Sequence, residues 1–355
     1  MQALPQSVNY PKMIIDKESH LDAQTRLHGL VDLDNEAYHA GPGISKSKLD
    51  AIAVSGLNYW DKYINPDREP EDFKHCFAVG DGTHKLILEP GTFEQSYAVG
   101  FDKSAHPEAL DSSAELKKAC SDNGCMTSGT KPELAERLIV EAGMPRDRIM
   151  LLLEQDHNKT MAGKIAMPSR DYKNMLGMLR AVNRDPWAGG LLSGATSEQS
   201  FFIGGEQGYW CHDTEQWITV DFLRKCRTDS ITANGEWIVD LKTTDDVSLD
   251  GFGKVIVNRR YEVQSAWYLD ILKDLYGSDA PKGFAFIAAQ KTRPYDVAVH
   301  YLTEEQIERG RRLYQRDAIR LHHCMTTNTW PGAANGDLLQ AKFPRWAEMQ
   351  FNDNY

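Results

Sequence analysis

The fold of this 355-residue chain is decided by the stretch Cys226-Arg-Thr-Asp-Ser-Ile-Thr-Ala-Asn-Gly-Glu-Trp-Ile-Val-Asp-Leu-Lys-Thr-Thr244. Its second half is apolar and β-branched and follows a turn-forming Ala-Asn-Gly, which predicts a short strand. Because side chains alternate across a strand, Asp240 and Lys242 share one face, and Val239 and Leu241 share the other. Asp229 lies eleven positions before Asp240, so we expect it on the preceding strand.

Two carboxylates beside an ammonium group favour one chemistry. They can hold a divalent metal and polarise a water molecule, as phosphodiester hydrolysis requires. An Asp-x-Lys strand alone is more often a half-exposed strand with an incidental ion pair. The functional interpretation of Asp240 and Lys242 therefore depends on further residues.

Further residues follow in a consistent order. His84 lies at the start of an apolar turn, and Glu198 opens a strand-like segment, 198–203. Gln264 and Tyr268 are four positions apart in a helical pattern, so they share a helix face. The order His, Glu, Asp, Asp-x-Lys, Gln-x-x-x-Tyr is similar to that of the PD-(D/E)xK nuclease superfamily, in its RecB-like exonuclease branch.

Flanking blocks narrow the resemblance. Residues 34–50, the run from Gly82 to Pro90, and Phe343-Pro-Arg-Trp-Ala347 resemble the C-terminal nuclease domain of the exonuclease VIII (RecE-type) family. The resemblance covers residues 29–101 and 162–355. It implies a ligand set for Mg²⁺, with Mn²⁺ as a substitute: Asp229, Asp240, the Leu241 carbonyl, His84 and Glu198. Lys242 would orient the attacking water or offset charge, and Gln264 and Tyr268 would position the nucleotide.

The same resemblance implies a biological role. Such an enzyme degrades linear duplex DNA from a 5′ end and leaves a 3′ single strand for recombination by strand annealing. A ring-shaped homo-oligomer, a trimer or tetramer, and a single-strand annealing protein as partner are also implied. Two alternatives remain open: a structure-selective or sequence-specific endonuclease of the same superfamily, and a non-catalytic DNA-binding accessory protein.

Composition is that of a soluble globular protein, with 41% hydrophobic and 26% charged residues. No apolar run approaches the length needed to span a bilayer, and the first residues lack the plan of a signal peptide. Six cysteines without Cys-x-x-Cys spacing predict free thiols in the cytoplasm and no iron–sulfur cluster. The net charge of −11 means that DNA must be bound by a local basic track.

Four basic residues are candidates for that track beside the site: Lys46, Lys48, Arg259 and Arg260. Ser45 is a candidate N-cap of a helix, so Lys46 and Lys48 fall in the first turns, where backbone N–H groups also favour phosphate. An ordinary solvated helix start is an equally good interpretation.

The domain plan is an N-terminal arm, 1–28, followed by a nuclease domain, 29–355, that an insertion at 104–145 interrupts. Two helical patterns, 113–124 and 132–143, surround a Ser-Gly-Thr-Lys loop, and this segment resembles the SAP motif, a small DNA-binding module. Its phosphate contacts would be Lys117, Lys118, Lys131 and Arg137. The segment is far from basic, which favours the alternative of a purely structural helical hairpin.

The remaining patterns complete the fold prediction. A packed helix is expected at 169–188, strands at 198–203, 216–231 and 236–243, a hairpin at 283–290 and 295–302, and a final helix after the Thr303…Gln306 capping box. A helix is also expected to open at Asp81. Together they predict an α/β fold of restriction-endonuclease-like type, with a mixed central sheet flanked by helices and a small helical insertion.

Overall fold

The structure is a computed structural model that describes residues 28–69, 75–161 and 163–343. The predicted arm, apart from residue 28, lies outside the described residues. So does the part of the Phe343–Ala347 block beyond residue 343. In the described part of the chain, no helix is both long enough and apolar enough to span a membrane.

A mixed sheet forms the centre of the body. Among the described residues its strand order is β1-β4-β7-β8-β9-β10. The strands are β1 (Gly29–Val31), β4 (Thr196–Ile203), β7 (Arg224–Ile231), β8 (Trp237–Thr244), β9 (Gly283–Gln290) and β10 (Val297–Tyr301). Only β8 and β9 run parallel within this sheet, because α12 (Leu249–Asn258) and α13 (Tyr261–Tyr276) form the crossover between them.

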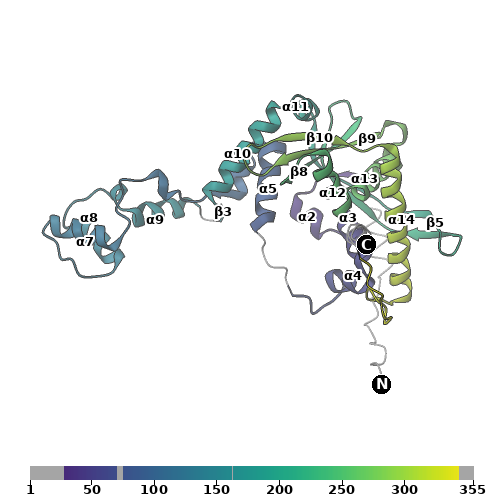
Figure 1. Cartoon of the computed structure of the whole chain (residues 1–355), viewed down its shortest axis with the longest axis horizontal. Helices are drawn as coiled ribbons and strands as arrows, with labels where there is room; N and C mark the ends of the chain where they lie inside the picture. Colours follow the sequence, from purple (N-terminus) through teal and green to yellow (C-terminus); the bar gives the residue numbers. More distant parts are fainter. Residues whose placement is uncertain (1–27, 70–74, 162, 344–355) are drawn as a thin grey trace, which may run out of the picture.

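Helices cover both faces of the sheet (Figure 1). On one face, α3 (Lys46–Val54), α13 and α14 (Glu304–Thr327) pack against side chains such as Ile238 and Phe286. On the other face, α5 (His75–Leu88) and α10 (Ser169–Arg184) pack against Val239, Leu241 and Ile287. The alternation expected of the Asp240 strand is therefore present, and the predicted fold class is confirmed.

The start of α5 differs from the prediction. The helix begins at His75, so Asp81 does not open it and His84 lies in its second half. Gly80 and Gly82 both lie within the helix. Gly82 lies close to α10, and a Cβ there would lie 2.5 Å from the Met175 Cε, so that the methionine side chain would have to shift. The helix thus continues through both positions despite the low helix propensity of glycine.

One further difference concerns the strands. The predicted strand 216–231 is two strands, β6 (Gln216–Asp221) and β7, and β6 forms a hairpin with β5 (Glu206–Cys211) outside the main sheet. The expected hairpin of β9 and β10 is present, and Thr303 and Gln306 form the capping box of α14. The other elements are α2 (Asn35–Ala40), α4 (Gly56–Tyr63), α6 (Phe93–Ser96), α11 (Pro186–Leu192) and the short 3₁₀ turns Lys103–Ala105, Arg146–Arg148 and Gly277–Asp279.

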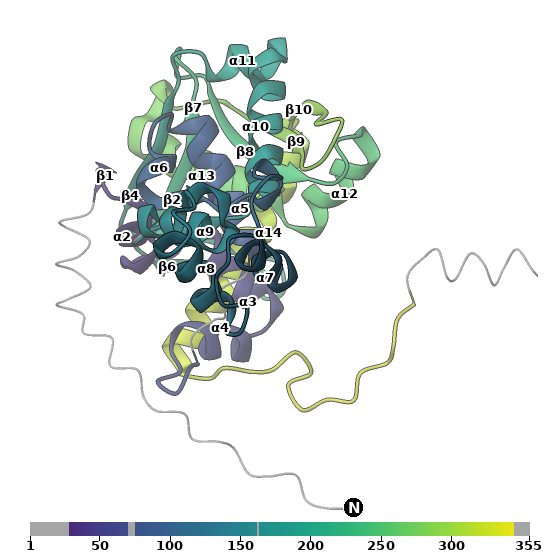
Figure 2. The ribbon, with the colours of Figure 1, turned by 90° about the vertical axis from the view of Figure 1, so that its left-hand side faces the viewer.

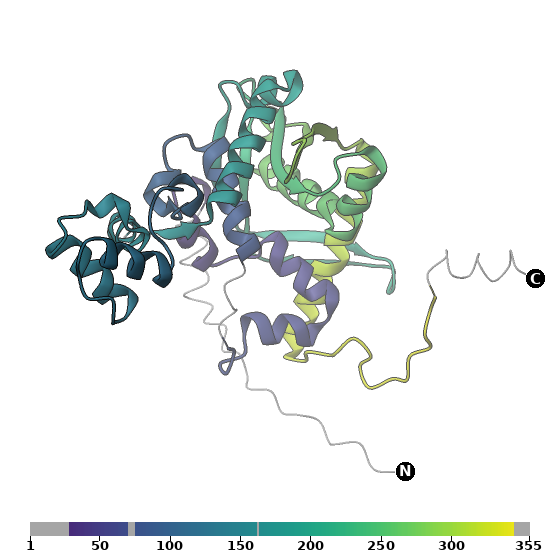
Figure 3. The ribbon, with the colours of Figure 1, turned by 60° about the vertical axis from the view of Figure 1, so that its left-hand side comes forward.

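The insertion projects from the body (Figures 1 and 3). Its base is the parallel pair of β2 (Tyr97–Val99) and β3 (Ile165–Met167). Its helices α7 (Ser113–Asp122), α8 (Lys131–Val140) and α9 (Met150–Thr160) share a buried cluster that includes Leu116, Leu134, Leu138, Ile149 and Leu152. The helical unit therefore continues past residue 145 through α9. Figure 2 shows α7 and α8 in front of the body.

Candidate active site

The site lies where the ladder between two central strands ends. Strands β7 and β8 pair through Ser230 with Val239 and Ile231 with Ile238. Beyond these pairs, the Leu241 amide donates a hydrogen bond of 2.8 Å to Asp229 Oδ2. A carboxylate thus replaces a backbone carbonyl as the partner of this amide. The exchange fixes Asp229 between the strands, with 16% of its side chain exposed.

Glu198 faces Asp229 from the next strand. Register places Glu198 opposite Asp229, because Ser197 pairs with Ser230 and Gln199 with Thr228, but no pair forms between them. Glu198 has φ of 54°, a left-handed backbone inside a strand. For a residue with a Cβ, this conformation has a cost on the order of 1–3 kcal/mol, and such residues are concentrated at functional sites.

An arginine that sequence reasoning missed holds the Glu198 carboxylate. Arg227 Nε lies 2.8 Å from Glu198 Oε2, and Arg227 Nη1 donates to Ser200 Oγ and the Leu33 carbonyl, each at 2.7 Å. Arg227 precedes Asp229 by two positions, but only the register of β4 on β7 shows that it meets Glu198. No local sequence signal could have found it.

His84 of α5 completes a group of three candidate metal ligands. One ligand atom from each of His84, Glu198 and Asp229 lies within 4.8 Å of the others. His84 Nδ1 is 3.4 Å from Asp229 Oδ2. The structure therefore brings together three of the predicted ligands from α5, β4 and β7, which are far apart in the sequence.

The electrostatics of this group favour a bound cation. Burial and the nearby Asp240 raise the pKa of Asp229. Burial and Asp229 raise the pKa of Glu198 to about 6, although Arg227 opposes the shift. Burial and the charge of Lys242 lower the pKa of His84, so its imidazole is neutral near pH 7 and retains a lone pair for a metal. Crowded carboxylates and a neutral imidazole are a donor set that a divalent cation would stabilise.

Asp240 belongs to a second arrangement beside the first. Its carboxylate is 1% exposed, and Lys242 Nζ lies 2.5 Å from its Oδ1. Gln264 of α13 donates a short hydrogen bond to its Oδ2. Asp240 is not one of the three grouped ligands, and its two oxygens contact Lys242 and Gln264. The role of the Leu241 carbonyl stays a prediction.

Lys242 is held in its charged form. Burial lowers its pKa, but Asp240 and Asp229 outweigh burial and raise the pKa above its ordinary value. The ammonium also lies 4.7 Å from the centre of the Tyr261 ring, a cation–π contact that sequence reasoning missed. A lysine held in this way acts as a fixed positive charge at neutral pH, and is a poor general base.

A small cavity of about 270 Å³ opens onto these groups. Its lining includes His84, Glu198, Asp229, Asp240, Lys242, Gln264 and Tyr268, together with Tyr38, Lys85 and Arg227. All the predicted catalytic side chains therefore border one cavity. Tyr268 is 9% exposed, and its position four residues after Gln264 places both on the cavity side of α13.

Three of the four predicted basic residues near the site hold the fold together. Lys46 Nζ lies 2.6 Å from Asp50 and donates to the Arg259 carbonyl at 2.7 Å. Lys48 Nζ donates to the Gly43 carbonyl at 2.8 Å. Arg260 pairs with Asp317 of α14. Arg259 is exposed, and its side chain is the most accessible of this set. Ser45 is the N-cap residue of α3, but its side chain makes no capping bond.

The basic residues of the insertion are similarly engaged. Lys118 pairs with Asp122 at 2.9 Å, and Lys131 with Asp111 at 3.0 Å. Arg137 donates to the carbonyls of Met126 and Ser128, at 2.6 and 2.9 Å, and so shapes the loop between α7 and α8. Lys117 is exposed.

Comparisons with known proteins agree with this fold. A family model described as “PDDEXK-like domain of unknown function (DUF3799)” matches residues 59–338. A solved structure named “Putative exonuclease”, from Eubacterium rectale, is similar with a TM-score of 0.50 and 14% identity, over 90% of this chain and 98% of that chain. At this identity the likeness shows the fold alone. Another, named SSO0001, matches at 14% identity over 68% of this chain and 86% of its own, with a TM-score of 0.22 that supports no argument.

No curated protein matches the chain. The matched residues include His84, Glu198, Asp229, Asp240 and Lys242, which all border the cavity. Because the matched region is more than half of the chain, the protein belongs to the PDDEXK-like family DUF3799, and its fold is that of the PD-(D/E)xK nuclease superfamily.

Proposed function

We propose that this protein is a divalent-metal-dependent DNA exonuclease of the RecE type, with Mg²⁺ as its metal and Mn²⁺ as a substitute. One observation carries the proposal. Glu198, held in a strained backbone conformation opposite Asp229, meets His84 beside the Asp240–Lys242 pair. Backbone strain and buried like charges are costly to a fold and are concentrated at functional sites, and a bound cation would offset the repulsion between the two carboxylates.

The residues of the site would act either as metal ligands or as residues that orient those ligands. Asp229, Glu198 and His84 would hold the metal, and Asp240 and the Leu241 carbonyl would be further ligands. The metal, when bound, lowers the pKa of a water nucleophile and stabilises the leaving oxygen. Arg227 keeps Glu198 oriented, and Gln264 keeps Asp240 oriented. Lys242 remains protonated and places positive charge near the phosphate under attack.

The route of the DNA is part of the same proposal. The nucleotide to be cut would lie in the cavity near Tyr268, with Arg259 and the neighbouring helix α3 on its backbone. Digestion from a 5′ end, a 3′ single strand as product, a ring-shaped trimer or tetramer and an annealing partner come from the RecE-type resemblance. The SAP-like insertion would add a contact to duplex DNA away from the site.

One assay tests activity, metal dependence and polarity. Linear duplex DNA labelled at either the 5′ or the 3′ ends is incubated with the protein in Mg²⁺, Mn²⁺ or EDTA. We expect early release of short labelled products from the 5′-labelled duplex in either metal and none in EDTA. Release that persists in EDTA would contradict the metal site, and early release from 3′ ends would reverse the polarity.

Circular DNA separates the exonuclease from the endonuclease alternative. A supercoiled plasmid should remain intact while the same plasmid, linearised, is consumed. Nicking or linearisation of the circle would favour an endonuclease. Binding of DNA without any hydrolysis would favour the accessory protein.

A further inference from the structure

We propose a second nucleic-acid site, a groove between α14 and the β5–β6 hairpin that binds the single strand the nuclease leaves uncut. The groove has a volume of about 950 Å³, and its walls include Trp210 of β5 and Arg312, Arg316 and Arg320 of α14. The inference rests on the proposed function for the source of that strand. The groove itself is described by its own lining residues, independently of the proposed function.

Arginines form a stripe along the exposed side of α14. Arg309, Arg312, Arg316 and Arg320 are three or four positions apart, so they share a helix face. At a rise of 1.5 Å per residue, the stripe is about 16 Å long. Arg309, Arg312 and Arg316 are 57%, 70% and 62% exposed. Such a row of guanidinium groups can neutralise successive phosphates of a nucleic-acid backbone.

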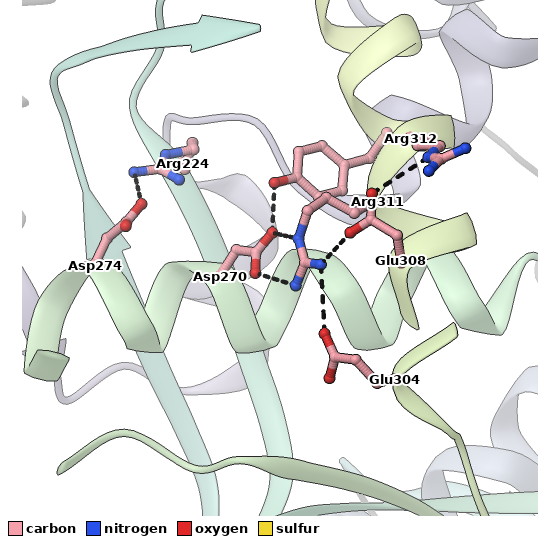
Figure 4. Close-up of polar contacts among 8 residues, drawn as sticks. Arg224, Asp270, Asp274, Glu304, Glu308, Arg311 and Arg312 are labelled. Carbon is pink, nitrogen blue, oxygen red and sulfur yellow. Dashed lines mark hydrogen bonds and ion pairs between the residues drawn. The ribbon is translucent and has the colours of Figure 1, made fainter. Parts of the chain in front are cut away.

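These arginines differ from their neighbour Arg311. Arg311 makes a two-pronged contact with Asp270 of α13, at 2.8 and 2.9 Å, and joins the two helices. Figure 4 shows Arg311 between the helices and Arg312 directed away from α13. Arg311 therefore joins α14 to α13, whereas Arg312 and Arg316 pair with Glu308 and Asp317 of α14 itself.

Charge within the groove is graded along the helix. The acidic side chains Asp213, Glu305 and Glu308 also border it. Glu308 already pairs with Arg311 and Arg312, at 2.6 and 3.3 Å. Arg320, in contrast, has no ion-pair partner in residues 28–69, 75–161 and 163–343. The basic end of the groove is thus the Arg316–Arg320 end.

Aromatic and apolar walls indicate a single strand. Trp210 is 38% exposed on the groove wall and stacks edge-to-face on Trp217, which is 70% exposed. Leu313 and Ile319 add apolar surface between the arginines. A single strand exposes base faces that stack on such rings, whereas a duplex hides them within its own stack. The combination of a cationic row and an indole in a concave groove therefore fits unpaired nucleotides.

The groove is linked to the active site by a short series of contacts. Gln264, which binds Asp240, lies one turn after Arg260 in α13. Arg260 pairs with Asp317, whose other oxygen binds Arg316 of the groove at 2.9 Å. The insertion and the β5–β6 hairpin lie at opposite ends of the molecule, with the central sheet between them (Figure 1). A duplex held by the insertion could therefore send one strand to the cavity and the other to the groove.

The test compares matched pairs of variants of the full-length protein in EDTA, where binding is measured without hydrolysis. Fluorescence anisotropy follows a labelled oligothymidylate and a labelled duplex over a range of salt concentrations. Arg316→Ala/Arg320→Ala is compared with Arg180→Ala/Arg184→Ala, which removes two exposed arginines from α10 on the other face of the sheet. Trp210→Ala is compared with Trp187→Ala, an exposed tryptophan on α11.

We expect the groove variants to weaken oligothymidylate binding at least tenfold and the control variants to leave it within twofold. The dependence of log affinity on log salt should become shallower by about 1.4 in the double arginine variant, or 0.7 per phosphate contact. Unchanged oligothymidylate affinity in folded groove variants would overturn the proposal. An equal loss on duplex would overturn its assignment to a single strand.

Hydrolysis of linear duplex in Mg²⁺ is measured separately on the same proteins. If the wild-type protein digests duplex and the Arg316→Ala/Arg320→Ala variant binds oligothymidylate as tightly as wild type, the protein has the nuclease function and no such groove site. A protein that binds the strand through the groove but never hydrolyses DNA has the binding site and lacks the proposed activity.

Discussion

The active site and the helical insertion were both predicted to contact DNA, but they are assembled differently: the insertion from neighbouring residues and the active site from distant ones. The insertion is built from consecutive residues: α7 and α8 each begin with a capping box, and Leu116 meets Leu134 across one loop. The active site joins Glu198 to Asp229 through the pairing of β4 with β7, and His84 reaches both from α5, far away in the sequence. Because the insertion folds from local contacts, its two helices could be predicted from the sequence. The same local contacts engage Arg137, Lys118 and Lys131, which were predicted to contact DNA.

The difference suggests that the active site performs the chemical step and that the insertion contributes to DNA binding. Charges at the active site are crowded and partly unsatisfied, which is favourable for catalysis and costly for stability. Charges on the insertion are paired and mostly exposed, so they contribute little to stability and remain exchangeable for phosphate. We therefore expect substitutions in the body to affect the chemical step and changes in the insertion to affect binding.

The largest effect is expected for Asp240→Asn. The substitution removes a negative charge beside the metal site but retains the size of the side chain. Loss of several kcal/mol of metal-dependent stabilisation corresponds to a rate at least about 10³-fold lower. The rate of release from 5′-labelled duplex checks this, with Asp250→Asn, an exposed acid of α12, as control. A near-normal rate in Asp240→Asn would remove Asp240 from the site.

Lys242→Ala should have the next largest effect. A fixed positive charge close to the attacked phosphate contributes about 10²-fold in rate, and duplex affinity should change much less. Single-turnover hydrolysis separates the two quantities. The exposed Lys254 of α12 provides a matched variant, Lys254→Ala, that should retain the wild-type rate. Equal rates in both variants would make Lys242 a structural partner of Asp240 only.

Removal of the insertion tests whether it contributes to the binding of duplex DNA. Residues 103–163 are replaced by a Gly/Ser linker of about eight residues, whose reach of roughly 15 Å allows β2 to continue into β3. We expect duplex affinity to fall about tenfold as the added phosphate contacts are lost, while the single-turnover rate at saturating DNA is retained. An unchanged affinity at several salt concentrations would show that the insertion does not bind DNA. A loss of the single-turnover rate would show that it supports the site.

The smallest effect expected is on thermal stability. The raised pKa values of Asp229 and Glu198 mean that the metal-free fold favours their protonated forms. Their contribution to stability is complete below the unfolded-state pKa values, near 4, and is lost as the pH rises through the folded-state values. In EDTA the melting temperature should therefore fall between pH 5 and pH 8.5.

Metal should reverse that loss. Mg²⁺ should raise the melting temperature more at pH 8.5 than at pH 5, by about 2–4 °C for each kcal/mol of stabilisation. Glu198→Gln should have a flatter pH profile in EDTA, because one of the two titrating carboxyls is absent. A Mg²⁺ effect that is equal at both pH values would contradict the assignment of these carboxyls as ligands.

Much of the fold was predictable because it depends on local pattern. Alternation gave the Asp240–Lys242 strand and the β9–β10 hairpin, and spacing placed Gln264 and Tyr268 on one face of α13. The expected capping box at Thr303 is present. The start of the His84 helix was not predictable in this way, since α5 begins at His75 and runs through Gly80 and Gly82.

The sequence by itself determined which residue types the site contains, their order, and the strands and helices that carry them. Turn, strand and helix signals extend over only a few residues, so they reach no further than such local elements. Tertiary structure alone decided how they meet: the left-handed Glu198 opposite Asp229, the Arg227 contact, and the engagement of Lys46, Lys48 and Arg260 in the fold. It also placed the β5–β6 hairpin beside the arginines of α14. The physical reason is that strand register and helix packing join residues without any local signal of which partner each will contact.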